Sequence, residues 1–143
     1  MTILIDADGC PVVDIAVKAA REHNVACVIL CDAAHIFSKP DAVTITVSTG
    51  RDSVDFALVN RIAPGDIVIT QDYGLAAMCL AKRAVPLNQN GLLYTNDNID
   101  ALLNERHMAR KQRMSGGRYK GPSKRTAEQD LTFEQALVRL LTD

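Results

Sequence analysis

Ile3–Pro11, with the sequence ILIDADGCP, is the stretch that decides the fold. Its three leading apolar residues, two of them β-branched, predict a short buried strand. Asp6 and Asp8 follow at alternate positions where the strand ends, and Gly9 and Pro11 favour a tight turn into a helix. In an open α/β sheet, ligands bind outside the carboxyl ends of the strands. Asp6 and Asp8 are therefore expected where such a fold carries out its chemistry.

Strand and helix patterns alternate along the rest of the chain. Apolar runs or two-residue alternation predict strands over residues 25–30, 43–47 and 67–70, with shorter ones at 85–87 and 91–94. Helical spacing predicts helices over residues 12–23, 54–62, 75–82 and 97–110, the last capped by Asn96. A C-terminal helix is also expected, with Thr132 and Gln135 as its capping box. This alternation predicts an α/β fold with a mostly parallel central sheet.

Composition indicates an ordinary globular protein. The 143 residues are 48% hydrophobic and 23% charged, which fits one domain over residues 1–143. No apolar run is long enough to span a membrane and no signal peptide is evident, so we expect a cytoplasmic protein without a membrane partner. The four cysteines form no CxxC pair and are interpreted as small core residues rather than zinc ligands. The absence of GxGxxG and Walker motifs argues against dinucleotide or P-loop sites.

Carboxylates recur where predicted strands end, and four of them form the candidate site. Asp6 and Asp8 follow the first strand, Asp72 follows the strand over 67–70, and Asp55 opens the helix after the strand over 43–47. Because parallel strands end at one edge, these side chains are expected to converge. Carboxylates that lie close together repel each other, and a bound divalent cation relieves that repulsion. Hard oxygen ligands suit Mg²⁺ or Mn²⁺, which activate water for phosphodiester attack.

Several of these carboxylates also have structural interpretations. Asp8 and Asp72 could instead cap the helices that follow them, and Asp52 is better placed as a helix N-cap, with Asp55 as its partner, than as a ligand. Asp66 precedes its strand, so we expect it at the opposite edge in a structural role. Asp6 has no helix end of its own, which favours a functional role.

Positive charge is concentrated late in the chain. Residues 1–100 hold 12 acids against 7 bases, whereas residues 106–125 hold eight of the 16 Lys and Arg and no acid. The interruption of this segment by glycines and a proline predicts a loop or arm that contacts a polyanion such as RNA. The alternative is a solvated loop, or a tail that anchors an acidic neighbour in an oligomer. The candidate nucleic-acid contacts are Arg110, Lys111, Arg113, Arg118, Lys120, Lys124 and Arg125.

Three acidic motifs, Ile3–Pro11, Asp52–Asp55 and Asp66–Ala76, resemble the YaiI/YqxD family of bacterial proteins, as does the later segment Arg118–Pro122. The resemblance covers essentially the whole chain. That family is in turn similar to PIN-domain nucleases, which carry an aspartate after the first strand, an acid on a central helix and a Thr-x-Asp turn.

Asp6, Asp55 and the turn from Thr70 to Asp72 occupy the places of those three motifs. The resemblance implies a three-layer α/β/α, PIN-like fold and Mg²⁺- or Mn²⁺-dependent RNA cleavage. Asp6, Asp55 and Asp72 would then be the catalytic ligands, with Asp8 as a further metal ligand. Position 55 departs from the commoner pattern, which has glutamate there, and the turn after Asp8 also differs.

Two other functions are compatible with the sequence. Asp6, Asp8 and Gly9 also resemble the first motif of haloacid-dehalogenase-type phosphatases, in which the first aspartate is a nucleophile. That family needs a later lysine and an acidic pair after a strand, neither of which is evident here. The second alternative is a PIN-like module that binds RNA without cleaving it.

Overall fold

The computed structural model describes residues 1–32, 39–47, 53–105 and 124–143. These contain a five-stranded sheet in the order β3-β2-β1-β4-β5, in which every neighbouring pair is parallel. The strands are β1 (Thr2–Asp6), β2 (Ala26–Asp32), β3 (Val43–Val47), β4 (Ile67–Ile69) and β5 (Val85–Leu87). The prediction of an α/β fold with a mostly parallel sheet is confirmed.

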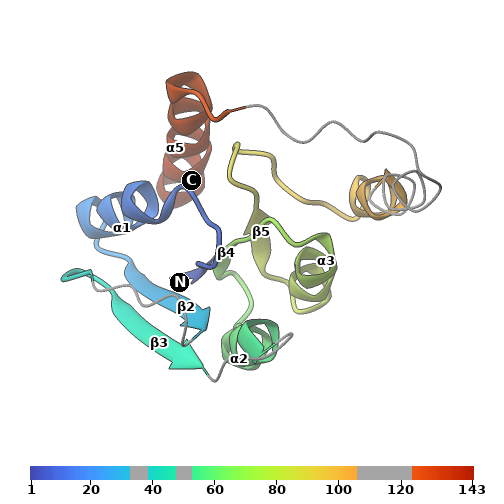
Figure 1. Cartoon of the computed structure of the whole chain (residues 1–143), viewed down its shortest axis with the longest axis horizontal. Coiled ribbons are helices and arrows are strands. Elements are labelled where there is room, and N and C mark those ends of the chain that lie inside the picture. Colours follow the sequence, from blue (N-terminus) through green and yellow to red (C-terminus); the bar gives the residue numbers. More distant parts are fainter. Residues whose placement is uncertain (33–38, 48–52, 106–123) are drawn as a thin grey trace.

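Helices cover both faces of this sheet (Figure 1). On one face, α1 (Val13–Glu22) packs against α5 (Ala127–Thr142), and on the other lie α2 (Ser53–Arg61) and α3 (Tyr73–Ala81). A further helix begins at residue 99 and is described as far as residue 105. The three-layer α/β/α architecture implied by the resemblance is therefore present.

The alternation of side chains along β1 explains the two layers of core. Ile3 and Ile5 are fully buried on the side of α1 and α5, whereas Leu4 is buried on the side of α2 and α3. Successive residues of a strand point to opposite faces of the sheet. Asp6 is two residues after Leu4, so its side chain is directed to the same face, the side of α2 and α3.

The path of the chain creates a topological switch point between β1 and β4. From β1 the chain adds β2 and then β3 on one side, and it returns to add β4 and β5 on the other. In open α/β sheets the crevice at such a reversal is the usual ligand site. The carboxyl ends of β1 and β4, where Asp6 and Asp72 stand, flank this point.

Asp66 has the structural role that its position predicts. Its side chain is buried and accepts hydrogen bonds from the backbone N–H of Thr2 and of Ala63, both at 2.9 Å. These bonds hold the start of β1 against the turn before β4, at the edge opposite the candidate site. The interpretation of the cysteines as core residues also agrees with the structure, since Cys27, Cys31 and Cys79 are buried.

Two helix starts were predicted at the wrong residues. The capping box of α5 is formed by Thr126 and Gln129, and Thr132 lies inside the helix, where its hydroxyl donates to the Glu128 carbonyl. Both threonines have a glutamine three residues later, and the helix-favouring stretch after Thr126 extends the helix towards its N-terminus.

The helix that begins at residue 99 is likewise capped earlier than predicted. Thr95 and Asn98 exchange hydrogen bonds between their side chains and backbone N–H groups, whereas Asn96 was the predicted cap. The strand expected over residues 91–94 is reduced to one antiparallel bridge between Leu87 and Leu93. The expected cap at Asp52 lies outside the described residues.

None of the described helices is both long enough and apolar enough to cross a membrane.

Candidate active site

Asp6 and Thr70 form the centre of the candidate site. In the sheet register Ile5 lies beside Ile69, so the next residues along both strands are neighbours that point to the same face. The Thr70 hydroxyl donates to Asp6 Oδ2 at 2.8 Å, and the Asp72 backbone N–H donates to the Thr70 Oγ1 at 3.0 Å. This chain of hydrogen bonds links the ends of β1 and β4 and fixes the orientation of the Asp6 carboxylate.

Asp6 is held in an environment that disfavours its charge. Its pKa rises from 3.8 to about 6, chiefly because burial removes the carboxylate from water, and the Thr70 hydrogen bond opposes that rise. The negative charges of Asp55, Asp72 and Asp8 raise the pKa further. The four carboxylates predicted to share this edge therefore interact electrostatically through Asp6, and a common metal site stays a prediction.

Asp55 and Asp72 approach Asp6 from the two helices on its face of the sheet. Asp55 lies in the first turn of α2. Asp72 is the N-cap of α3, and its Oδ1 accepts the Leu75 backbone N–H at 3.1 Å. The capping interpretation of Asp72 is therefore correct, and its backbone N–H belongs to the same turn that positions Thr70. Metal ligation by either aspartate stays a prediction.

Asp8 connects the turn after β1 to the neighbouring strand. Its carboxylate accepts the Asp32 backbone N–H, at 3.1 Å for Oδ2 and 3.4 Å for Oδ1. It does not supply the cap of α1, because the N-cap position is Val12 and has no side-chain capping bond. Asp8 therefore fastens this turn to the end of β2, a role that neither of the interpretations from sequence anticipated.

Other polar contacts support the site from outside the acidic group. The Tyr94 hydroxyl donates to the Thr70 carbonyl at 3.1 Å from a fully buried position, and the Gln71 side chain donates to the Gly9 carbonyl at 2.9 Å. Tyr94 also meets Tyr73 edge to face, with ring centroids 5.9 Å apart. Local sequence patterns give no signal for these contacts, which join distant parts of the chain.

The donor chemistry of the site fits a hard divalent cation. Carboxylate oxygens are the ligands that Mg²⁺ and Mn²⁺ prefer, and Asp55, Asp72 and Asp8 add to the rise that desolvation causes in the pKa of Asp6. Within the described ranges, no three His, Cys, Asp or Glu side chains are arranged closely enough to enclose an ion. Mg²⁺ seldom needs such a cage, because it usually keeps several waters and binds through one or two carboxylates and substrate phosphates.

The described part of the basic segment consists of Lys124 and Arg125. Lys124 is exposed, whereas Arg125 is occupied: it donates to Asp130 Oδ1 at 2.6 Å, to Asn90 Oδ1 at 2.7 Å and to the Gln89 carbonyl at 2.6 Å. The guanidinium thus joins the start of α5 to the loop after β5. The other predicted contacts, Arg110, Lys111, Arg113, Arg118 and Lys120, lie outside the described residues.

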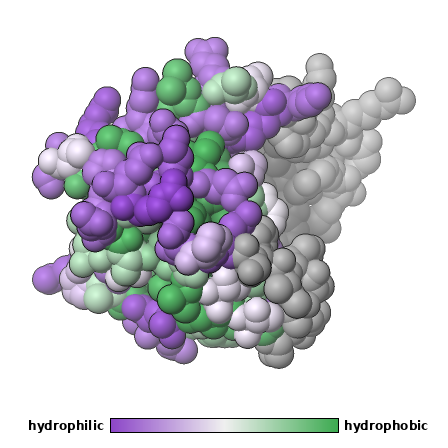
Figure 2. All heavy atoms as spheres, turned by 90° about the vertical axis from the view of Figure 1, so that its left-hand side faces the viewer, coloured by the Kyte–Doolittle hydropathy of each residue, from purple (hydrophilic) through white to green (hydrophobic). Residues whose placement is uncertain are grey.

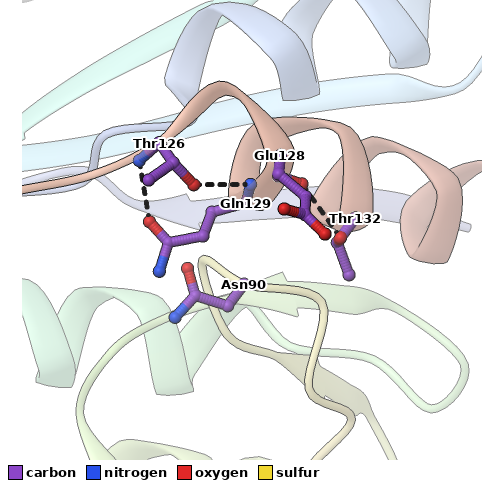
Figure 3. Close-up of a pocket in the computed structure, with 5 residues that line it drawn as sticks. All are labelled: Asn90, Thr126, Glu128, Gln129 and Thr132. Carbon is purple, nitrogen blue, oxygen red and sulfur yellow. Dashed lines mark hydrogen bonds between the residues drawn. The ribbon is translucent and has the colours of Figure 1, made fainter.

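A polar pocket of about 360 Å³ lies beside this connection, between the loop after β5 and the N-terminus of α5 (Figure 3). It is lined by Asn90, Thr126, Glu128, Gln129 and Thr132, and the capping box of α5 forms one of its walls. Its described lining includes the carboxylate of Glu128 and no basic side chain. The acidic edge is the better candidate for the active site.

The raised pKa of Asp6 predicts a pH-dependent stability in metal-free buffer. The folded state binds the Asp6 proton more tightly than the unfolded state, so the free energy of unfolding falls as the pH rises from about 4 to about 6. The contribution of Asp6 to that fall is about 3 kcal/mol. We expect Asp6→Asn to gain stability relative to the parent over this interval, as measured by urea unfolding in EDTA. If the difference in the free energy of unfolding between the two proteins stayed constant from pH 4 to pH 7, the raised pKa of Asp6 would be contradicted.

Comparisons with known proteins give a consistent result. Residues 4–143 match the sequence profile described as the uncharacterised YaiI/YqxD family. A UPF0178 protein of Exiguobacterium sibiricum is 54% identical over 143 residues, covering 100% of this chain and 98% of the relative. A UPF0178 protein of Clostridium acetobutylicum is 48% identical, covering 99% of this chain and 97% of the relative. One of Ruminiclostridium cellulolyticum is 49% identical, covering 96% of this chain and 90% of the relative. No solved structure matches the chain significantly.

Proposed function

The chain belongs to the YaiI/YqxD family, and we propose that it is a divalent-metal-dependent nuclease that hydrolyses phosphodiester bonds in RNA. The resemblance of its acidic motifs to those of PIN-domain nucleases suggested this function. What carries the proposal is the state of Asp6, whose carboxylate lies at the switch point of the sheet, largely removed from water, with three other carboxylates that raise its pKa further. Such an arrangement costs the folded protein stability, and a bound cation would relieve that cost.

Asp6 and Asp72 are proposed to hold the cation, with Asp55 and Asp8 as further ligands, because all three other carboxylates act on Asp6. A bound Mg²⁺ or Mn²⁺ would supply an activated water and stabilise the charge that develops on the scissile phosphate. Thr70 keeps the Asp6 carboxylate in one orientation, and Asp72 is fixed by its hydrogen bond to the start of α3. Asp8 holds the turn after β1 against β2, so the strand-end backbone keeps its shape.

The basic segment is proposed to bind the RNA backbone. Its lysines and arginines would offset the repulsion between the acidic edge and the phosphates, and each phosphate contact would increase the salt dependence of binding. Arg125 is already bound within the chain, so this role falls to the remaining basic residues of the segment.

Cleavage of end-labelled single-stranded RNA tests the proposal. The purified protein is incubated with Mg²⁺, with Mn²⁺ or with EDTA, beside Asp72→Asn and the matched surface variant Glu22→Gln. Glu22 is exposed in the last turn of α1, away from the carboxyl edge. We expect cleavage by the parent and by Glu22→Gln in either metal, and none in EDTA or with Asp72→Asn.

Two results would contradict the nuclease assignment. If Asp72→Asn cuts as fast as the parent, the activity belongs to a contaminant or to another surface. If no protein cuts but the parent binds RNA in a salt-dependent manner, a non-catalytic RNA-binding module becomes the better description.

A further inference from the structure

Among the residues that the structure describes, no strand pairs with the outer edge of β3. β3 is the terminal strand of the sheet, and no described residue forms a strand on its outer side (Figure 1). Proteins usually guard such an edge with a lysine, a proline or a bulge, because its N–H and C=O groups are free to pair with another strand. Val43–Val47 contains none of these devices and no charged residue. Val43 and Thr46 are exposed there.

The sequence of this strand is a palindrome, Val-Thr-Ile-Thr-Val. If two copies pair in an antiparallel manner about a two-fold axis at Ile45, Val43 faces Val47 of the second copy and Thr44 faces Thr46. Ile45 faces its own equivalent. Pairs of β-branched residues and of threonines are among the favourable cross-strand pairs, and a two-fold contact uses the same surface on both subunits.

The two faces of the strand also match across this axis. The register with β2 places Val43, Ile45 and Val47 beside Val28, Leu30 and Asp32, and Ile45 and Val47 pack on the α2 side of the sheet. Pairing about the axis would therefore continue one apolar row from copy to copy.

Threonines form the corresponding row on the opposite face. Thr44 and Thr46 lie beside Ile29 and Cys31, on the face covered by α1, and the Thr46 hydroxyl is 3.9 Å from Cys31 Sγ. The same pairing aligns these threonines with those of the second copy, so like side chains meet on both faces of the sheet.

The two described charges just before the strand, at positions 39 and 41, are engaged within the chain. Asp41 is paired with Arg21 of α1 at 3.0 Å, and Lys39 with Asp14 at 2.6 Å. Both ion pairs hold the segment before β3 against α1, so they do not oppose an incoming strand. Figure 2 shows this side of the molecule: the region over α1 and α5 is mostly hydrophilic, whereas in the lower part apolar and pale residues lie among hydrophilic ones.

We propose that β3 pairs with β3 of a second copy of this chain, so that two sheets join into one continuous sheet. Because all strands within a copy are parallel, the two-fold axis directs the two acidic edges to opposite ends of the joined sheet. The contact is separate from the candidate active site, so the dimer and the nuclease activity can be tested independently.

Charge substitutions at the facing threonines test the pairing. The mass of the full chain is measured by sedimentation over a range of concentrations. In the double variant Thr44→Lys/Thr46→Lys, the lysine at position 44 of each copy faces the lysine at position 46 of the other. We expect the dissociation constant of the dimer to rise about tenfold or more. In Thr44→Lys/Thr46→Glu, each lysine faces a glutamate, and we expect the dimer to return. Because both variants carry Thr44→Lys and differ only in the charge at position 46, their comparison reports charge pairing once circular dichroism shows that both are folded.

Cysteine crosslinking tests the register. At position 45 the two copies face each other within reach of a disulfide, whereas the two copies of position 43 lie about 14 Å apart. Under mild oxidation, Ile45→Cys is therefore expected to give a covalent dimer that neither Val43→Cys nor the parent forms. A monomer at every concentration, a dimer that survives Thr44→Lys/Thr46→Lys, or equal crosslinking by both cysteine variants would overturn the proposal.

Discussion

Replacing Asp6 by asparagine is expected to lower metal-dependent RNA cleavage about 1000-fold, since loss of a cation's contribution costs several kcal/mol of transition-state stabilisation. The substitution keeps the shape of the side chain, and its amide oxygen can still accept the Thr70 hydroxyl that now donates to Asp6. It removes only the charge and one anionic ligand oxygen. The change therefore separates chemistry from packing more cleanly than alanine would.

The same substitution is expected to stabilise the metal-free protein at neutral pH. The parent must hold the Asp6 carboxylate in a buried place beside Asp55, Asp72 and Asp8, which raises its pKa to about 6. An uncharged amide avoids both the desolvation and the repulsion. Loss of activity together with a gain of stability is the signature of a residue kept for function, because a merely structural carboxylate would lose stability when it is replaced.

Three measurements check this prediction: cleavage rates in Mn²⁺, Mn²⁺ binding by calorimetry, and urea unfolding at pH 7 in EDTA. Glu22→Gln serves as the control, because it removes a carboxylate from an exposed position on α1. Metal should raise the unfolding midpoint of the parent and not that of Asp6→Asn. Unchanged metal binding in Asp6→Asn, or a variant less stable than the parent at pH 7, would contradict the assignment of Asp6.

The acidic edge could be predicted from sequence because it depends on where strands end. Buried apolar runs located β1 and β4, and the parallel topology then placed Asp6 and Asp72 at one edge. The Asp6–Thr70 hydrogen bond forms because the register of β1 with β4 makes these two residues neighbours on the same face of the sheet. That register is known only once the two strands are paired. The resemblance to PIN-domain nucleases singled out Thr70 as part of the Thr-x-Asp turn, but it did not identify Asp6 as its hydrogen-bond partner.

Contacts between distant parts of the chain could not be predicted in this way. Asp66 and Thr2 are 64 residues apart, and Arg125 and Asn90 are 35 apart, yet both pairs are hydrogen-bonded. Local periodicity carries no information on such pairs. Arg125 shows the consequence: a basic side chain in a basic segment was interpreted as a phosphate contact, although three hydrogen bonds within the chain engage it.

The C-terminal helix provides the largest expected effect on stability. Phe133 is fully buried and belongs to the core cluster on the α1 side of the sheet, together with Val13 and Ile5. Phe133→Ala is expected to lower the free energy of unfolding by about 3–5 kcal/mol, because it leaves a cavity where α5 packs against α1. Urea unfolding followed by circular dichroism measures the loss.

A matched truncation on the same helix distinguishes packing from helix propensity. Leu131 is 54% exposed, two residues before Phe133, so Leu131→Ala is expected to change the free energy of unfolding by no more than about 0.5 kcal/mol. Alanine favours helices at both positions, so a difference between the variants reports burial. Similar losses in both would mean that Phe133 does not anchor α5. The Arg125 connection to the loop after β5 would then be the stronger candidate for holding the helix on the sheet.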